Sequence, residues 1–209
     1  GLAASLTTMA LRAVNTNGGS ADRSDYKTAT TTGAAPTSNI SVMGTATGTS
    51  TATMPTHAIG DLILLYVHDD GSSTIPGMPS GYTTINSEGA SNSANILAYK
   101  VAVSASETIG TIGGGVDSVI LAVLRGHNGV GATSKSSGAS GTVLSYPTVS
   151  MVQTNGTSWV FGFGATRAGD STIETAPSGM TNRTSAKDAT DGAAMHDTNA
   201  GVTGWAGAT

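Results

Sequence analysis

The chain has 209 residues, no cysteine and a formal net charge of −4 at pH 7, and only 11% of its residues are charged. Its length suffices for a self-standing core, and the lack of cysteine excludes disulfides and thiolate metal ligands. Without a basic stripe, neither nucleic acid nor an anionic membrane is an expected partner. The 29 glycines and the abundant Thr and Ser favour strands and turns over helix.

The first 39 residues carry the weakest pattern. Leu2, Leu6 and Met9 recur at near-helical spacing, and a polar run rich in Asn, Gly, Ser and Thr follows them. We interpret residues 1–39 as an N-terminal arm, extended or partly helical, with a junction near Pro36. A disordered tail has a similar composition. The functional alternative is an arm that becomes ordered against a neighbouring subunit.

From residue 40 onward the chain alternates apolar runs with turns. Residues 61–67 are almost continuously apolar, which is typical of a strand buried on both faces. We expect further strands at 40–54, 80–85, 95–103, 116–125, 142–151 and 158–165. The small-residue segment 131–141 is expected to be a loop. Strands of this length without helical intervals predict an all-β fold, an antiparallel β-sandwich or jelly roll, over residues 40–209.

The sequence also repeats itself. Residues 71–75, GSSTI, return 98 residues later as GDSTI, and PSGYT at 79–83 returns at the same offset as PSGMT. This offset also lays Leu62–Leu65 over Val160–Phe163. Self-similarity at a fixed period indicates a repeated structural unit. We therefore predict two similar β units, about residues 40–126 and 127–209, packed through one continuous core.

The repeat leaves the second unit without a closing strand. The counterpart of the apolar strand 116–125 would fall beyond Thr209. Three explanations stay open: the gene product extends beyond Thr209, residues 204–209 begin the closing strand, or a neighbour supplies it. An incomplete sheet presents unpaired N–H and C=O groups, which invite pairing with another chain. This edge and the arm predict a homo-oligomer or a lattice-bound subunit.

The tightest cluster of potential metal ligands is His68-Asp69-Asp70. Carboxylate oxygens and imidazole nitrogens on a turn can bind Ca²⁺ or a transition metal. The alternative is a solvated turn, because Asp-Asp-Gly is a common turn sequence. We favour the turn, since the second unit has Thr166-Arg167-Ala168 in the equivalent place.

Catalytic motifs are not apparent in the sequence. No serine lies in a G-x-S-x-G elbow. The glutamates, Glu88, Glu107 and Glu174, all fall in expected turns, whereas a glycosidase needs two carboxyl groups facing each other across a groove. We therefore expect a protein that is not an enzyme, with no catalytic residues and no cofactor.

Four segments together resemble a known family. They are Gly60–Leu65 (GDLILL), Pro79–Thr83 (PSGYT), Ala98–Ala102 (AYKVA) and Ala122–Gly126 (AVLRG). This series resembles the pattern "AGDLLV", "P.GWT.", "A.YKVA" and "..YRG" of a β-sandwich module that is widespread among tailed-phage virion proteins and some bacterial surface proteins. The resemblance covers residues 40–209, and Tyr82 stands where the family usually has Trp.

The resemblance implies a non-enzymatic virion structural protein of a bacteriophage, either a capsid decoration or cement protein or a component of the tail or its fibres. Its partners would be other virion proteins, and a trimer is favoured because fibres and decoration spikes commonly are trimers. Synthesis in the host cytoplasm fits the absence of a recognisable export signal. The alternative is a surface adhesion or carbohydrate-binding module with a host glycan as ligand. Its stacking surface would come from Tyr66, Tyr82, Tyr99 and Tyr146, although two or three of these are expected in the core.

Overall fold

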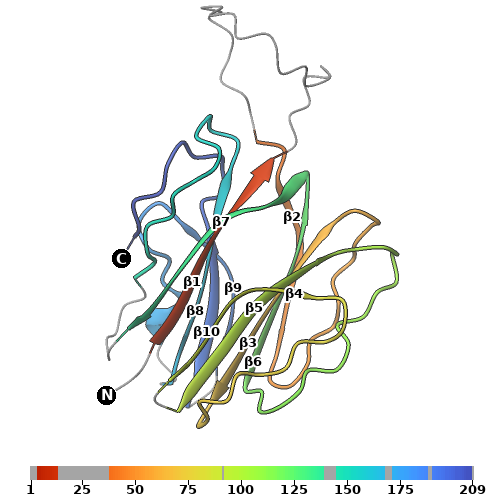
Figure 1. Ribbon diagram of the computed structural model, residues 1–209, viewed down its shortest axis with the longest axis vertical. Helices are drawn as coiled ribbons and strands as arrows, with labels where there is room; N and C mark the ends of the chain where they lie inside the picture. The colour runs from red at the N-terminus through yellow and green to blue at the C-terminus, as the bar shows by residue number, and fades with distance from the viewer. Residues whose placement is uncertain are drawn as a thin grey trace, which may run out of the picture.

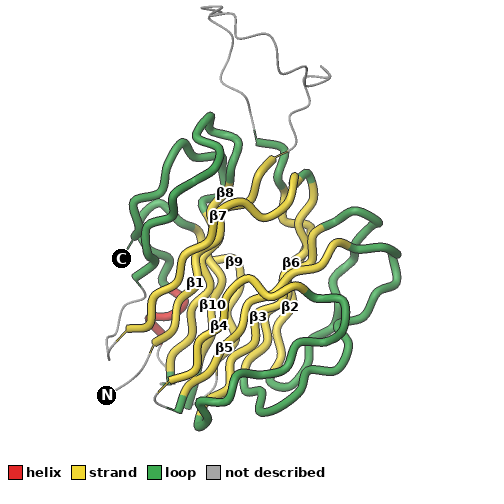
Figure 2. Tube along the Cα trace, in the orientation of Figure 1, coloured by secondary structure: helices red, strands yellow, loops and turns green. Residues whose placement is uncertain are grey.

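The computed structural model describes residues 4–13, 38–90, 92–138, 145–167, 171–187 and 190–208. Over these ranges the chain forms two antiparallel β-sheets that face each other, as Figures 1 and 2 show. A short 3-10 helix, η1 (Ser171–Glu174), is the sole helical element in the described ranges. The prediction of an all-β, sandwich-like fold is therefore confirmed. None of the described helical structure has the length and apolar character of a membrane span.

Each sheet has five strands. The first sheet has the order β2-β6-β3-β5-β4, and its strands are β2 (Ser41–Gly48), β3 (Leu62–Asp70), β4 (Thr83–Ala90), β5 (Ser93–Val101) and β6 (Ser118–Arg125). The second sheet has the order β7-β1-β8-β10-β9, and its strands are β1 (Ala4–Ala13), β7 (His127–Gly138), β8 (Trp159–Thr166), β9 (Thr181–Lys187) and β10 (Gly192–Asp197).

The two sheets repeat one pattern. Strands β3, β4 and β5 have the same neighbours in the first sheet as β8, β9 and β10 have in the second. The pairing of β4 with β5 skips Ile85, and the pairing of β9 with β10 skips Arg183, which is 98 residues later in the sequence. A bulge changes the phase of every side chain after it. The same bulge at the same place therefore indicates a repeated unit rather than two unrelated hairpins.

Strand β8 is the counterpart of β3, but the structure aligns the two strands one residue away from the alignment that the 98-residue offset gives. Leu64 pairs with Tyr99, and Phe161 pairs with Asp197, which lies 98 residues after Tyr99. Phe161 is therefore the counterpart of Leu64, and both lie in the core between the sheets. The constant offset would have assigned Gly162 instead. Because side chains alternate along a strand, this one-residue difference decides which face is buried between the sheets.

Strand β1 corrects the interpretation of the N-terminus. Ala4–Ala13, inside the predicted arm, pairs with β8 on one side and β7 on the other. In Figure 1 it runs as the red arrow within the second sheet, in the position that β6 has in the first. Met9 is completely buried there. Of the two forms expected for the arm, the extended one holds over this segment, because two neighbouring strands satisfy its backbone. The rest of the predicted arm before Ser38 lies outside the described residues.

Other local expectations also change. The expected loop 131–141 is mostly strand β7, because β1 offers it a pairing partner despite its small side chains. The strand expected at 80–85 runs instead over β4. Of the strand expected at 142–151, residues 142–144 lie outside the described ranges. The remainder makes isolated bridges to the C-terminal segment, Tyr146 with Ala208 and Val149 with Trp205. The segment 204–208 therefore packs on 145–151 and does not close the sheet.

Hydrophobic residues fill three layers. The inter-sheet core contains Leu62, Leu64 and Tyr66 of β3 and Phe161 and Phe163 of β8. On the outer face of the first sheet, the other residues of β3 pack under loop residues that include Ile109, and Figure 2 shows these loops flanking the sheet. A smaller layer around Tyr146 covers the second sheet. Burial on both faces is why the sequence of β3 is almost continuously apolar.

Candidate functional site

His68, Asp69 and Asp70 end strand β3, but their side chains do not converge. His68 and Asp70 share the phase of Tyr66 and face the second sheet, whereas Asp69 lies on the outer face. Asp70 forms an ion pair with Arg167, which follows β8. Among the described residues there is no group of three or more His, Cys, Asp or Glu side chains that could hold a metal ion.

The outward Asp69 belongs to a carboxyl pair. It is 5% exposed and shares a hydrogen bond with the side chain of Asp117. Burial, and then the negative charge of Asp117, raises the pKa of Asp69 above its usual range. The Asp117 carboxylate also accepts the backbone N–H of Asp70 at 2.6 Å. A Cβ on Gly115 would lie 2.4 Å from an Asp69 oxygen, so a glycine is needed for this close approach. The pair fixes the turn before β6.

The inward His68 belongs to a row of buried polar side chains. Asn95 on β5 and Ser118 on β6 lie directly opposite His68 on either side. His68 Nδ1 lies 3.2 Å from the carbonyl oxygen of Ala94, and Ser118 Oγ donates to Asp191, just before β10, at 3.0 Å. Burial lowers the pKa of His68, so its imidazole is neutral. The row thus places three buried polar side chains between the two sheets.

The motifs Gly60–Leu65 and Ala122–Gly126 meet at the opposite end of β3. Arg125 donates two hydrogen bonds to the carboxylate of Asp61, with Nε to Oδ1 at 2.8 Å and Nη2 to Oδ2 at 2.7 Å. The backbone N–H of Ala58 donates to the same carboxylate at 2.8 Å. The hydrogen bonds from Arg125 hold the pKa of Asp61 below its usual range. This bidentate pair joins the start of β3 to the end of β6.

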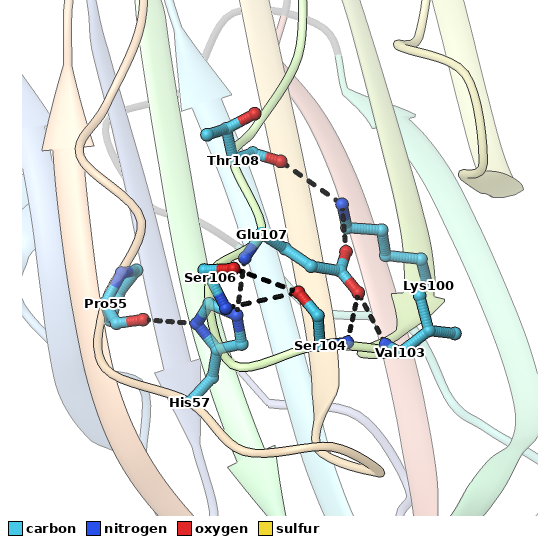
Figure 3. Close-up of polar contacts among 8 residues, drawn as sticks. All are labelled: Pro55, His57, Lys100, Val103, Ser104, Ser106, Glu107 and Thr108. Carbon is cyan, nitrogen blue, oxygen red and sulfur yellow. Dashed lines mark hydrogen bonds and ion pairs between the residues drawn. The ribbon is translucent and has the colours of Figure 1, made fainter.

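The motifs Pro79–Thr83 and Ala98–Ala102 contact each other through Tyr82 and Lys100. Lys100 also belongs to the cluster of polar contacts in Figure 3, and we call His57, Tyr82, Lys100, Val103 and Glu107 together the loop clamp. Lys100 Nζ lies 4.9 Å from the ring centroid of Tyr82 and 2.5 Å from Glu107 Oε2. The other Glu107 oxygen accepts the N–H of Val103, and the hydrogen bond from Lys100 lowers the pKa of Glu107. A cation over an aromatic face is favourable, so the clamp fastens these loops to β5.

His57 connects the clamp to the loop before β3. Its Nδ1 lies 2.8 Å from the carbonyl oxygen of Pro55, and its Nε2 accepts the N–H of Glu107 at 3.2 Å. These two contacts fit a ring that donates from Nδ1 and accepts at Nε2. Beside the clamp lies a groove of about 460 Å³, lined by residues that include Ser80, Lys100 and Thr111.

A further buried pair covers the second sheet. Tyr146 O–H lies 2.7 Å from His196 Nδ1, and both residues are almost completely buried. Burial lowers the pKa of His196 to about 4, so its ring is neutral and accepts this hydrogen bond. Gly162 makes room for the tyrosine ring, because a Cβ there would lie 2.6 Å from it. This arrangement serves packing, not an exposed reactive site.

Comparison with known proteins finds no matching family model, no matching curated protein and no matching solved structure.

Sequence reasoning missed Asn95, Ser118 and Asp191 as members of a buried polar group. A usable signal was present for the first two. Asn95 shares the strand phase of Leu97, and Ser118 shares that of Ile120, so each is a polar residue in an apolar phase. Asp191 had no comparable signal, because it reaches the row only through the packing of the two sheets.

Proposed function

We propose that this chain is a non-enzymatic structural protein of a tailed-phage virion, acting as a capsid decoration protein or as a component of the tail or its fibres. The observation that supports it is that the four family-like motifs contact one another in pairs. Asp61 binds Arg125, and Lys100 lies over Tyr82. The motifs are far apart in the sequence, so their pairing is what a genuine structural module would produce. It makes chance similarity a poorer explanation of the resemblance.

The acidic side chains support a structural role. All three glutamates of the sequence form ion pairs with lysines: Glu107 with Lys100 at 2.5 Å, Glu88 with Lys135 at 2.8 Å and Glu174 with Lys187 at 3.0 Å. The first pair ties a loop to β5, the second ties β4 to β7 of the other sheet, and the third ties η1 to β9. Acid–base hydrolysis of a glycoside needs two carboxyl groups placed across a substrate groove. Each of these glutamates instead forms an ion pair with a lysine.

The aromatic residues do not favour the adhesion alternative. Tyr66 and Tyr146 are buried in the core, as part of the tyrosine set was expected to be. The ring of Tyr82 is covered by Lys100. A stacking platform for a host glycan would need exposed aromatic faces, so we do not carry a glycan-binding function further.

Assembly stays a prediction. The open edge that suggested a partner lies next to β8, and β1 of the same chain fills it. The remaining basis for a homo-oligomer, with a trimer favoured, is the resemblance to virion proteins. Light scattering of the purified protein would measure its mass in solution directly.

The test of the proposed function is the composition of phage particles. Antibodies raised against the purified chain should label purified particles of the phage that carries this gene, on the capsid or along the tail, and peptides of the chain should be detected in those particles by mass spectrometry. Particles from a phage with the gene deleted are the control. If particles contain no copy of the chain while the infected cells do, the proposal is wrong.

A further inference from the structure

The polar row between the sheets, His68, Asn95 and Ser118, is unusual for its position. The exposed fractions of the three residues are 0%, 1% and 2%. Their neighbours in the same strand phase belong to the apolar inter-sheet core. Polar side chains at such positions are normally compensated by hydrogen bonds, because burying an unpaired donor or acceptor is costly.

Most polar atoms of this region have no protein partner within the described part of the chain. They are Nε2 of His68, both Oδ1 and Nδ2 of Asn95, and Oγ of the adjacent Ser93. Because His68 Nδ1 donates to the carbonyl of Ala94, its Nε2 presents a lone pair. The region thus offers two acceptors, one amide donor and one hydroxyl group that can do either.

Two contacts between the sheets place His68 in the sandwich. The rings of Tyr66 and Phe163 lie 5.5 Å apart, and Asp70 pairs with Arg167. His68 lies between these contacts along β3, and Ala165 lies between them along β8. The histidine therefore faces a small side chain.

The internal repeat shows that the row is not a requirement of the fold. By strand register, Ala165 is the counterpart of His68, and Ala193 is the counterpart of Asn95. Both alanines are completely buried. The same architecture therefore accepts apolar residues at these positions in the second sheet.

One end of the row reaches the surface. Ser118 and its partner Asp191 line a cleft of about 280 Å³ between the ends of β2 and β9, which Asp117 and Lys187 also line. Solvent in this cleft therefore reaches the Ser118 end of the row.

We propose that this row is a hydration site, which binds ordered water between the two sheets and exchanges it with solvent through the cleft at Ser118 and Asp191. Water can donate to His68 Nε2 and to Asn95 Oδ1 and accept from Asn95 Nδ2. A buried water molecule typically makes about three hydrogen bonds to polar groups that lack other partners. A metal ion fits less well, because the described residues include no three-ligand group.

Two substitutions test the hydration site by whether they raise or lower the midpoint of thermal unfolding. Asn95→Leu and Ser93→Ala each replace unpaired polar atoms by apolar ones. At a hydrated site both lower the midpoint of thermal unfolding, because the water loses partners that it had. At a dry site both raise it, because an uncompensated polar group is removed. Ser50→Ala, at an exposed position, is the control and should leave the midpoint unchanged.

Two direct measurements complete the test. A crystal structure at high resolution should show solvent density within hydrogen-bonding distance of His68 Nε2 and Asn95. Oxygen-17 relaxation dispersion should detect long-lived internal water in the wild-type protein and less of it in Asn95→Leu. The absence of solvent density, raised midpoints for both variants, or an anomalous scattering peak from a metal at this position would overturn the proposal.

Discussion

Met9→Ala tests whether β1 completes the second sheet. Met9 is completely buried in the inter-sheet core and pairs with Phe161 on β8 and Thr133 on β7. The substitution removes three heavy atoms beyond Cβ, worth roughly 2.4 kcal/mol at about 0.8 kcal/mol per buried group. A cavity term adds to this, so we expect the free energy of unfolding to fall by about 3 kcal/mol, inside the roughly 2–5 kcal/mol range for such core truncations.

The measurement is urea unfolding, followed by circular dichroism, of the wild type and two variants. Met43→Ala is the matched control, because Met43 lies on β2 with 42% of its surface exposed, and it should change the free energy of unfolding by no more than about 0.5 kcal/mol. If Met9→Ala changes it as little as the control does, β1 is not part of the core and the arm interpretation returns.

The same experiment, repeated at several protein concentrations, tests whether association contributes to stability. A midpoint that rises with concentration would agree with the predicted homo-oligomer, and a midpoint that is independent of concentration would contradict it.

Three further predictions concern the core, a close contact and a titrating group. Leu64→Ala and Phe161→Ala should each lower the free energy of unfolding, measured with urea, by about 2–5 kcal/mol, because both side chains are completely buried at equivalent positions of the two sheets. A loss below about 0.5 kcal/mol would place that residue at the surface. Gly162→Ala should lower the free energy of unfolding by about 1–3 kcal/mol, because its Cβ would meet a tyrosine ring. Gly204→Ala is the control and should not lower it, because nothing lies within 4 Å of a Cβ there. Equal effects of the two substitutions would contradict the packing around Gly162. The raised pKa of Asp69 means that its stabilising contribution is present below the ordinary carboxyl pKa and is lost as pH rises through the folded-state value. Asp69→Asn should therefore raise the thermal midpoint at pH 7 and change it little near pH 3, and a pH-independent difference would count against this.

The sequence by itself determined the fold class and the repeat. Residues 61–67 predicted a strand buried on both faces, and β3 has that environment because the second sheet covers one side and loops cover the other. The offset of 98 residues correctly related β4 to β9 and β5 to β10, down to the bulges at Ile85 and Arg183. These features depend on local composition and on similarity between segments, which are visible in one dimension.

The tertiary structure alone decided which strand closes the second sheet and which polar groups meet. Ala4–Ala13 and the segment 131–138 carry weak patterns, and they are strands because they pair with each other and, for β1, with β8. The polar row likewise depends on register: a shift of one residue in β3 would turn His68 away from the second sheet. Strand pairing joins residues far apart in the sequence through backbone hydrogen bonds, which any side chain permits. The partner of a weakly patterned strand therefore becomes known only when the sheet has formed.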